Sequence, residues 1–468
     1  MKRWVNIVYI FFGVIFLSNV YADNGSNSTL SYFQKKIALQ KLPEAYMAYK
    51  DKDYQKALAI YKNLADQGNP VAQFMLGYLN QNGLGVSAND LLAFAWYMRA
   101  NTNGLNEAKY AVGLLYYYGM GVSQGVSQAF QLFKDASESS PQAQYMLGYM
   151  SSTGMGTEKN IDLTKEYYDK AAKSGVVQAQ YNLGLMYYIG SDVKNDYTKA
   201  FNLFSLAAQQ GHSKSQFMLG LMYSLGRGVA ANKSQAFYWY AQAARQGLPV
   251  AQYNLGIAYY NGFGVQPSLE NAVIWIQKSA NQGFSRAEYF MGYLIYNGVG
   301  VDKNISESLD WYTKAAEQNL SDAQFALGYL FHNGFGVEKD DRRALGWYLL
   351  AAKQGLPNAE YMSGLFYQKG IGVPRDAKQA AFWYTKASEQ GMDNAQLLLG
   401  IMYTRGQGLP KDLKLGYAWL ELASTSSNIK IRDAAIKLRD DLEKNMTAED
   451  ITAAKLLTKD FYDKYNSD

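Results

Sequence analysis

Apolar and polar residues recur along most of this chain with the period of a helix, and the same arrangement returns every 36 residues. Each of ten copies is centred on a glycine that usually follows a leucine, with a small residue at position −5 and usually a large residue at +3. Positions −5, −1 and +3 share one helical face, so each copy predicts an amphipathic helix. The reference glycines are Gly77, Gly113, Gly148, Gly184, Gly220, Gly256, Gly292, Gly328, Gly364 and Gly400. A single interval is one residue shorter, near Ser139, and a period this constant predicts a solenoid.

The first helix of each copy, helix A, is expected to begin at position −7. Four of the eight prolines lie there, where a first helical turn does not need the missing N–H: Pro70, Pro141, Pro249 and Pro357. Glycines at +6 and +8, such as Gly262 and Gly264, are expected to end it, because glycine readily adopts the positive φ of a C-terminal cap. A phosphate-binding Gly-x-Gly would follow a strand and occur once, whereas this pair recurs in nine of ten copies. Asp192 replaces the second glycine in the fourth copy.

A second helix, helix B, is expected to run to about position +26. It carries a small residue at +16, a large pair at +19 and +20 such as Trp275-Ile276, and a following glycine, which Asn319 replaces once. Small residues on both helices allow close approach, and we expect the aromatic residues to fill the space between one hairpin and the next. One hairpin cannot bury its apolar face alone, but a stack can. The predicted fold is therefore all-α, an α-solenoid of antiparallel helix pairs.

The repeated string A-[QE]-x-x-L-G-x-x-Y-x-x-G-x-G-V, followed by A-x-x-W-Y-x-x-A-A-x-x-G, resembles the Sel-one-like repeat, a relative of the tetratricopeptide repeat. The resemblance covers roughly residues 69–427 and implies ten such repeats wound into a right-handed superhelix. Residues 37–68 resemble a preceding tetratricopeptide-like half-unit. Residues 428–468 resemble the terminal helices that close such arrays, and Thr447 with Asp450 marks a helix start there.

The first 22 residues have the three parts of a secretory signal peptide. Lys2 and Arg3 precede an apolar core from about Val5 to Leu17, which is shorter than the ~20 residues that a membrane-spanning helix needs. Ala22 ends a cleavage signal, and residues 23–36 are expected to be a polar linker. We therefore expect an exported protein, periplasmic or secreted, with no membrane span after cleavage, from a Gram-negative bacterium.

Composition narrows the functional classes. The chain has no cysteine, so it forms no disulfide and carries no lipoprotein anchor. The formal net charge of +5 falls to +3 when Lys2 and Arg3 are removed, which is too small and too evenly spread to favour nucleic acid or an anionic membrane as a partner.

Little in the sequence favours an enzyme. His212 and His332 are the two histidines, and neither has a second histidine or a cysteine to share a metal. We predict no catalytic residue, no cofactor and no metal site. An alternative comes from the resemblance alone: cysteine-rich Sel-one-like proteins are linked to β-lactam or cell-wall hydrolysis, but their disulfides have no counterpart here. A lumenal adaptor of eukaryotic quality control is a third possibility, against which the lack of cysteines counts.

Binding is the better-supported function. By analogy with tetratricopeptide repeats, helix A lines a concave groove, and positions +1, +4 and +5 point into it. These positions vary between copies, and tyrosine, with its large rigid face and polar tip, is well suited to interfaces. The candidate partner-binding residues are Tyr117, Tyr188, Tyr260, Tyr296, His332, Asn261, Asn297, Asn333, Lys369 and Arg405. We expect a non-enzymatic scaffold for a protein or peptide, and the resemblance implies a role in envelope assembly or in host-cell entry and intracellular survival.

Overall fold

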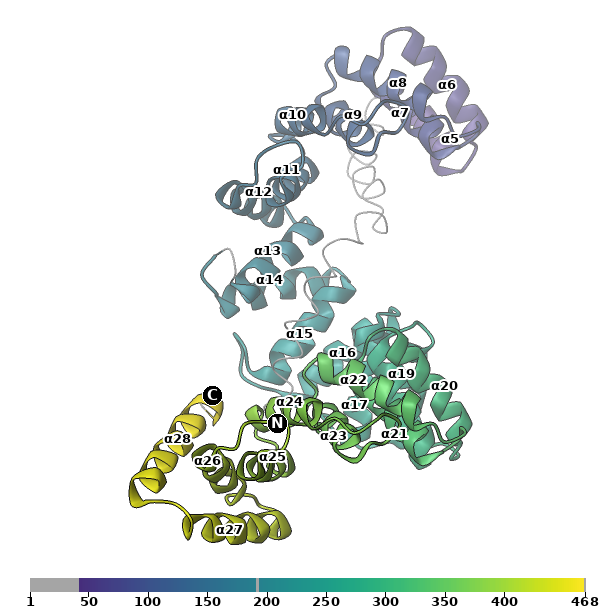
Figure 1. Cartoon of the computed structure of the whole chain (residues 1–468). Coiled ribbons are helices and arrows are strands. Elements are labelled where there is room, and N and C mark those ends of the chain that lie inside the picture. The colour runs from purple at the N-terminus through teal and green to yellow at the C-terminus, as the bar shows by residue number, and fades with distance from the viewer. Residues whose placement is uncertain (1–41, 191–192, 467–468) are drawn as a thin grey trace. The chain divides into compact units, whose positions relative to one another are not determined.

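The chain is a succession of helices in the computed structural model, which describes residues 42–190 and 193–466 (Figure 1). Those residues form 24 helices and no strand, so the predicted all-α fold of repeated helix pairs is confirmed. The predicted signal peptide and linker, residues 37–41 of the half-unit, and Asp192 lie outside the described residues.

The helices belong to two compact units, divided between Ala231 and Asn232. The first unit holds α5 (Pro43–Lys50), α6 (Tyr54–Asp66), α7 (Pro70–Asn82), α8 (Asp90–Thr102), α9 (Asn106–Tyr118), α10 (Val126–Ala136), α11 (Pro141–Thr153), α12 (Ile161–Lys173), α13 (Val177–Ile189), α14 (Tyr197–Gln209) and α15 (Ser213–Leu225). The second holds α16 (Lys233–Arg245), α17 (Pro249–Asn261), α18 (Leu269–Ala280), α19 (Ser285–Asn297), α20 (Ile305–Glu317), α21 (Ser321–Asn333), α22 (Asp341–Lys353), α23 (Pro357–Lys369), α24 (Ala377–Glu389), α25 (Asp393–Arg405), α26 (Leu413–Ala423), α27 (Ile429–Glu443) and α28 (Ala448–Asn466). The odd-numbered helices from α7 to α25 are the helices A of the ten copies, and the even-numbered helices from α8 to α26 are the helices B.

Helix A begins at position −7 and ends at +5 in all ten copies, as predicted. The glycine at +6 adopts the left-handed cap, with φ of 66° at Gly262. The glycine at +8 has a further role that the sequence analysis did not include. A Cβ atom on Gly264 would lie 2.1 Å from the carbonyl oxygen of Lys233, in helix B of the preceding repeat. This second glycine is therefore needed for close contact between repeats as well as for the turn.

Helix B begins at a capping residue at position +12, which the sequence analysis did not locate. The side chains of Asn89, Asn160, Asp196, Asn232, Ser268, Asn304, Asp340, Asp376 and Asp412 each accept a hydrogen bond from a backbone N–H in the first turn. Asparagine, aspartate and serine are the preferred N-cap residues. Their recurrence at +12 in nine of ten copies was the available signal, and Gly125 is the exception.

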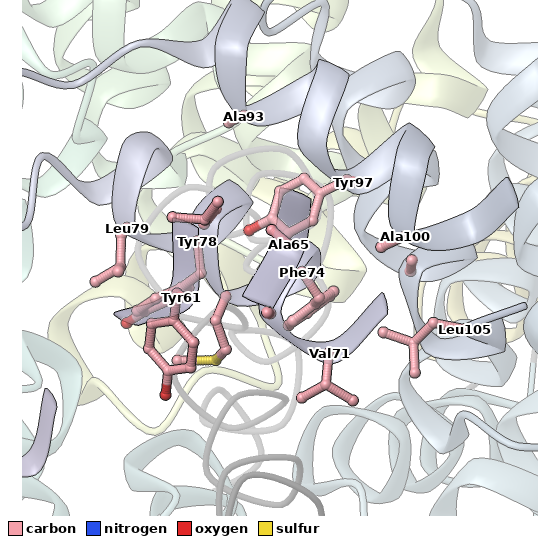
Figure 2. Close-up of a cluster of buried hydrophobic side chains, with 14 of the residues drawn as sticks. Tyr61, Ala65, Val71, Phe74, Tyr78, Leu79, Ala93, Tyr97, Ala100 and Leu105 are labelled. Carbon is pink, nitrogen blue, oxygen red and sulfur yellow. The ribbon is translucent and has the colours of Figure 1, made fainter. Parts of the chain in front are cut away.

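The two helices of a hairpin interlock through the reference glycine. A Cβ atom on Gly328 would lie 2.6 Å from the ring of Tyr348, at position +20, and Gly77 has the same relation to Tyr97. Figure 2 labels Tyr97 with Phe74, whose ring centroid lies 5.0 Å away. The expectation that aromatic residues fill the space between hairpins is thus corrected for position +20, because that ring is needed inside its own hairpin.

Position +19, in contrast, does pack between repeats. Trp383 lies against Ala351 and Ala352 of the preceding helix B, and Trp311 lies beside the cluster around Ile276. The two neighbouring large residues of helix B therefore have different tasks, one within the hairpin and one between hairpins.

A buried glutamine at position −4 connects successive repeats. Gln324 donates a hydrogen bond to the carbonyl oxygen of Ala316 in the preceding helix B, and its own amide oxygen accepts one from Gln354 at the end of its repeat (2.8 Å). Five other glutamines at −4 also donate to the backbone carbonyl oxygen of the residue eight positions earlier: Gln73, Gln180, Gln216, Gln252 and Gln396. Both ends of a buried amide are thus satisfied.

Two copies have glutamate at this position. Glu288 and Glu360 accept hydrogen bonds from Gln318 (2.7 Å) and Gln390 (2.8 Å). A carboxylate cannot donate to the carbonyl oxygen that glutamine reaches elsewhere, whereas a protonated carboxyl can. Burial is the main cause that raises the pKa of both side chains.

Helices at both ends of the array also agree with the sequence predictions. In the first unit, α6 occupies the position of a helix B, and its Tyr61 is fully buried. At the other end, the predicted start of α28 is confirmed, since the backbone N–H of Asp450 donates to Thr447 Oγ1 (3.1 Å).

We predict that Gly328→Ala lowers the stability of the second unit by about 1–3 kcal/mol, because the added methyl group overlaps the Tyr348 ring. Gly346→Ala is the matched control, since nothing lies within 4 Å of a Cβ there, and helix propensity alone should stabilise it by about 1 kcal/mol. Thermal unfolding followed by circular dichroism measures both. Equal melting temperatures for the two variants would contradict the interlock.

We also predict that the double variant Glu288→Gln, Glu360→Gln is more stable than the native chain at neutral pH, by about 1 kcal/mol per site. A carboxyl whose pKa is raised on folding contributes stability that is fully present below its ordinary pKa of 4.5 and is lost as pH rises through the folded value. Glutamine removes this loss, so the gap between the melting temperatures of the two proteins should widen from pH 4 towards neutrality. The reverse change, Gln324→Glu, should introduce such a loss, and parallel pH profiles for all three proteins would refute the explanation.

Candidate partner-binding face

The candidate site is the face of helix A formed by positions +1, +4 and +5, here called the helix-A face. Positions −5 and −1 of the same helix are buried in the hairpin, whereas tyrosines at +3 pack on helix B of the preceding repeat, as Tyr116 does on Phe94 and Tyr259 on Phe237. The helix-A face is what remains for contacts outside the repeats. The two units differ along this face, and the difference lies in which side chains stay exposed.

In the first unit, the candidate tyrosines are in the core. Only 8% of Tyr117 and 4% of Tyr188 is exposed. The Tyr117 hydroxyl donates to Met155 Sδ (3.3 Å), and the Tyr188 hydroxyl accepts a hydrogen bond from Arg227 (2.8 Å). Met155 and Arg227 both stand at +7 of the next repeat, so these tyrosines connect repeats and are too deep to offer a surface to a partner. Their expected place on an open face is corrected accordingly.

In the second unit, the tyrosines at +4 are half-buried and lie close to the next repeat. The Tyr260 ring meets Phe290 edge to face, with centroids 5.3 Å apart, and Lys303 Nζ lies 5.6 Å from the Tyr296 ring. Partial burial, and then a neighbouring tyrosine of the next repeat, raise the pKa of both hydroxyls. Both side chains are therefore uncharged at neutral pH.

Those neighbours are Tyr293 and Tyr329, two residues that the sequence analysis did not name. Both stand at +1, with 37% and 43% of their surface exposed. The ring of Phe290 stacks on that of Tyr293 with centroids 5.5 Å apart, and the ring centroids of Tyr329 and Phe335 lie 5.8 Å apart. The available signal was a tyrosine at +1 in two successive copies of the second unit, where the copies on either side have aliphatic residues. Tyr260 lies beside Tyr293, and Tyr296 lies beside Tyr329. These four tyrosines of α17, α19 and α21 are here called the tyrosine run.

The residues at +5 border this run. Asn261, Asn297 and Asn333 are exposed. Asn297 and Asn333 donate to the backbone carbonyls of Tyr293 and Tyr329 (2.8 Å each) and so brace the helix ends that carry the two exposed rings. Further along the same unit, Lys369 and Arg405 are exposed and add positive charge on α23 and α25.

The histidines are held in local contacts. His212 caps α15 by accepting from the Ser215 backbone N–H (3.3 Å). His332 Nδ1 lies 2.5 Å from Asp341 Oδ1, and its ring packs 4.9 Å from Phe366. A His–Asp pair can orient a base for a nucleophile, but no serine or threonine hydroxyl is hydrogen-bonded to His332 among the described residues. Within the same residues, no group of three His, Cys, Asp or Glu side chains could hold a metal ion.

The repeat boundaries now allow comparison with known families. The model of the Sel1 repeat matches residues 48–69, 70–105, 106–140, 141–176, 177–212, 213–248, 249–284, 285–320, 321–356, 357–392 and 393–428. The chain belongs to the Sel1 repeat family. The match includes α6 as a partial eleventh copy, which agrees with its place as a helix B.

Two solved structures are similar over most of their length. A protective antigen present in uropathogenic Escherichia coli strains is 32% identical, with a TM-score of 0.58, and the alignment covers 87% of this chain and 95% of that one. A Sel1 repeat protein from Oxalobacter formigenes is also 32% identical, with a TM-score of 0.53, covering 70% of this chain and 93% of that one.

Among curated proteins, the chain is 33% identical over 143 residues to an ERAD-associated E3 ubiquitin-protein ligase component of Arabidopsis thaliana, covering 28% of this chain and 21% of the relative. It is likewise 33% identical to mouse sel-1 homolog 2, of which it spans 20%. The chain thus spans about a fifth of the length of these relatives. Proteins of the Sel1 repeat family act in protein–protein interaction. None of the described helices has the length and apolar character needed to cross a membrane.

Proposed function

We propose that this protein is an exported, non-enzymatic scaffold that binds a protein or peptide partner on the helix-A face of its second unit. The observation that carries the proposal is the tyrosine run. Tyr293 and Tyr329 are exposed yet held on a rigid repeat, so a partner can cover them without a large loss of side-chain entropy. Aromatic side chains of this kind dominate the binding energy of many protein interfaces.

The charges further along the helix-A face of the second unit suggest the partner's chemistry. Lys369 and Arg405 are exposed on consecutive helices A, α23 and α25. A segment with apolar or aromatic residues on the tyrosines and acidic residues towards α25 would complement this surface. Such rim charges mainly increase the association rate and lose effect as salt is raised.

The biological setting that we propose is the envelope of a Gram-negative bacterium, or secretion from it. Support comes from the leader-like N-terminus and from the similarity to a protein described as a protective antigen of uropathogenic Escherichia coli. In that setting the scaffold would aid envelope assembly, or host-cell entry and intracellular survival.

Capture with exposed-tyrosine variants tests the binding face. The full chain, immobilised, is incubated with periplasmic and host-cell extracts beside two variants. One is the double variant Tyr293→Ser, Tyr329→Ser, and the other is the control Tyr238→Ser. Tyr238 is a matched control because 47% of it is exposed, but it lies on helix B. We expect the native chain and the control to retain the same partner proteins, and the double variant to retain about tenfold less of them or lower. Equal retention by all three proteins would reject the helix-A face as the binding surface.

A further inference from the structure

The C-terminal helix α28 shows how the solvent-facing side of a helix B can be covered. It packs against α26, and the two lie side by side in Figure 1. The ring of Phe461 stacks on Trp419 with centroids 4.7 Å apart, and Tyr465, four residues later, lies 6.1 Å from the same tryptophan. One face of an amphipathic helix thus covers the tryptophan at position +19.

Polar contacts set the direction of α28. Near its start, Asp450 lies 3.5 Å from Lys414 Nζ at position +14 of α26. Near its end, the Tyr465 hydroxyl donates to Glu389 (3.3 Å), which stands at +25 of the preceding repeat, on α24. The two helices therefore run in the same direction, with opposite charges matched at the N-terminal end.

The surface beneath α28 has a defined composition. Ala418 at +18 is buried, and the small side chain leaves room for the covering helix. Leu422 at +22 is buried in the cluster that includes Trp419, Phe461 and Tyr465. The α28 site therefore consists of a basic residue at +14, a small residue at +18, tryptophan at +19, leucine at +22, and glutamate at +25 of the repeat before.

The same five features recur on α22. That helix carries Arg342 at +14, Gly346 at +18, Trp347 at +19 and Leu350 at +22, and α20 ends with Glu317 at +25. Here the surface around the half-buried Trp347 is open: 43% of Leu350 is exposed, and nothing lies within 4 Å of a Cβ built on Gly346. Arg342 and Glu317 are exposed as well.

The other helices B with a tryptophan at +19 depart from this pattern. On α24, the small residue is replaced by Phe382, whose exposed ring lies 4.9 Å from Trp383 and occupies the space that a covering helix needs. On α18 and α20, position +18 holds Ile274 and Asp310, and on α16 it holds Tyr238. In the first unit, α8 has Leu91 where the basic residue would stand.

We propose that α22, with the end of α20, is a second docking site, distinct from the helix-A face, for an amphipathic helix of a partner protein. The partner helix has the chemistry of α28: two aromatic residues four positions apart, an acidic first turn and a hydroxyl donor near its end. The acidic turn lies opposite Arg342, the aromatic pair covers Trp347 and Leu350, and the hydroxyl donates to Glu317. This fits helix-in-groove recognition, in which side chains at i and i+4 are the anchors.

Binding of a labelled peptide with the sequence of residues 447–466 to the full chain tests the proposal, measured by fluorescence anisotropy. The native α28 remains on α26 in this protein, so the peptide reports on a further site. We expect saturable binding that weakens about tenfold or more with Gly346→Phe, which copies Phe382 of the next repeat, and with Leu350→Glu. Ile274→Glu is the control for an exposed apolar residue on another helix B, and it should bind as the native chain does.

Three outcomes would overturn the proposal. The first is no binding to the native chain, and the second is equal binding to Gly346→Phe, Leu350→Glu and the native protein. The third is a dimer of the native chain in light scattering that Leu350→Glu converts to a monomer, because the occupant would then be α28 of a second copy. Circular dichroism of each variant establishes that it is folded.

Discussion

The close contact between the reference glycine of helix A and the large side chain at +20 of helix B is what the rest of the structure depends on. In most hairpins a ring lies where any Cβ atom would be, so the two helices approach more closely than larger residues would allow. That contact fixes one side of helix A against helix B. The side chain at +19 is then free to pack on the preceding repeat, while Tyr293 and Tyr329 at +1 and several side chains at +5 are exposed to solvent or a partner.

Contacts between repeats add to this interlock in a regular way. The glycine at +8 lets one turn touch the preceding helix B, and the glutamine at −4 connects helix B of one repeat with the end of the next. Each repeat is therefore stabilised mainly by its neighbours, as in other solenoids. A rigid array of this kind presents side chains at fixed spacing, which suits it to protein binding rather than to chemistry that needs several groups to converge.

Much of the fold was predictable from the sequence because it repeats. Some residues recur because the local backbone requires them, and aligning ten copies shows this recurrence. They are the proline at −7, the glycine at +6, and the glycine or Asn319 after helix B. The candidate site was less predictable, because the exposure of a residue at +4 depends on the neighbouring repeat. Tyr188 is buried among Tyr197, Phe204 and Arg227 of the next repeat, whereas Tyr260 keeps part of its surface. Aligning the copies with one another shows which positions vary. The burial of a residue at +4, however, depends on residues 33 to 39 positions later, in the next repeat.

Site-specific photo-crosslinking in living cells tests most directly whether the tyrosine run binds a partner. A photoreactive phenylalanine analogue is placed at Tyr329 and, in a separate protein, at Tyr238, which has similar exposure but lies on helix B. Irradiation is predicted to yield a discrete crosslinked protein from position 329 and none of that product from position 238. The same product from both positions, or from position 238 alone, would contradict a partner-binding role for the helix-A face.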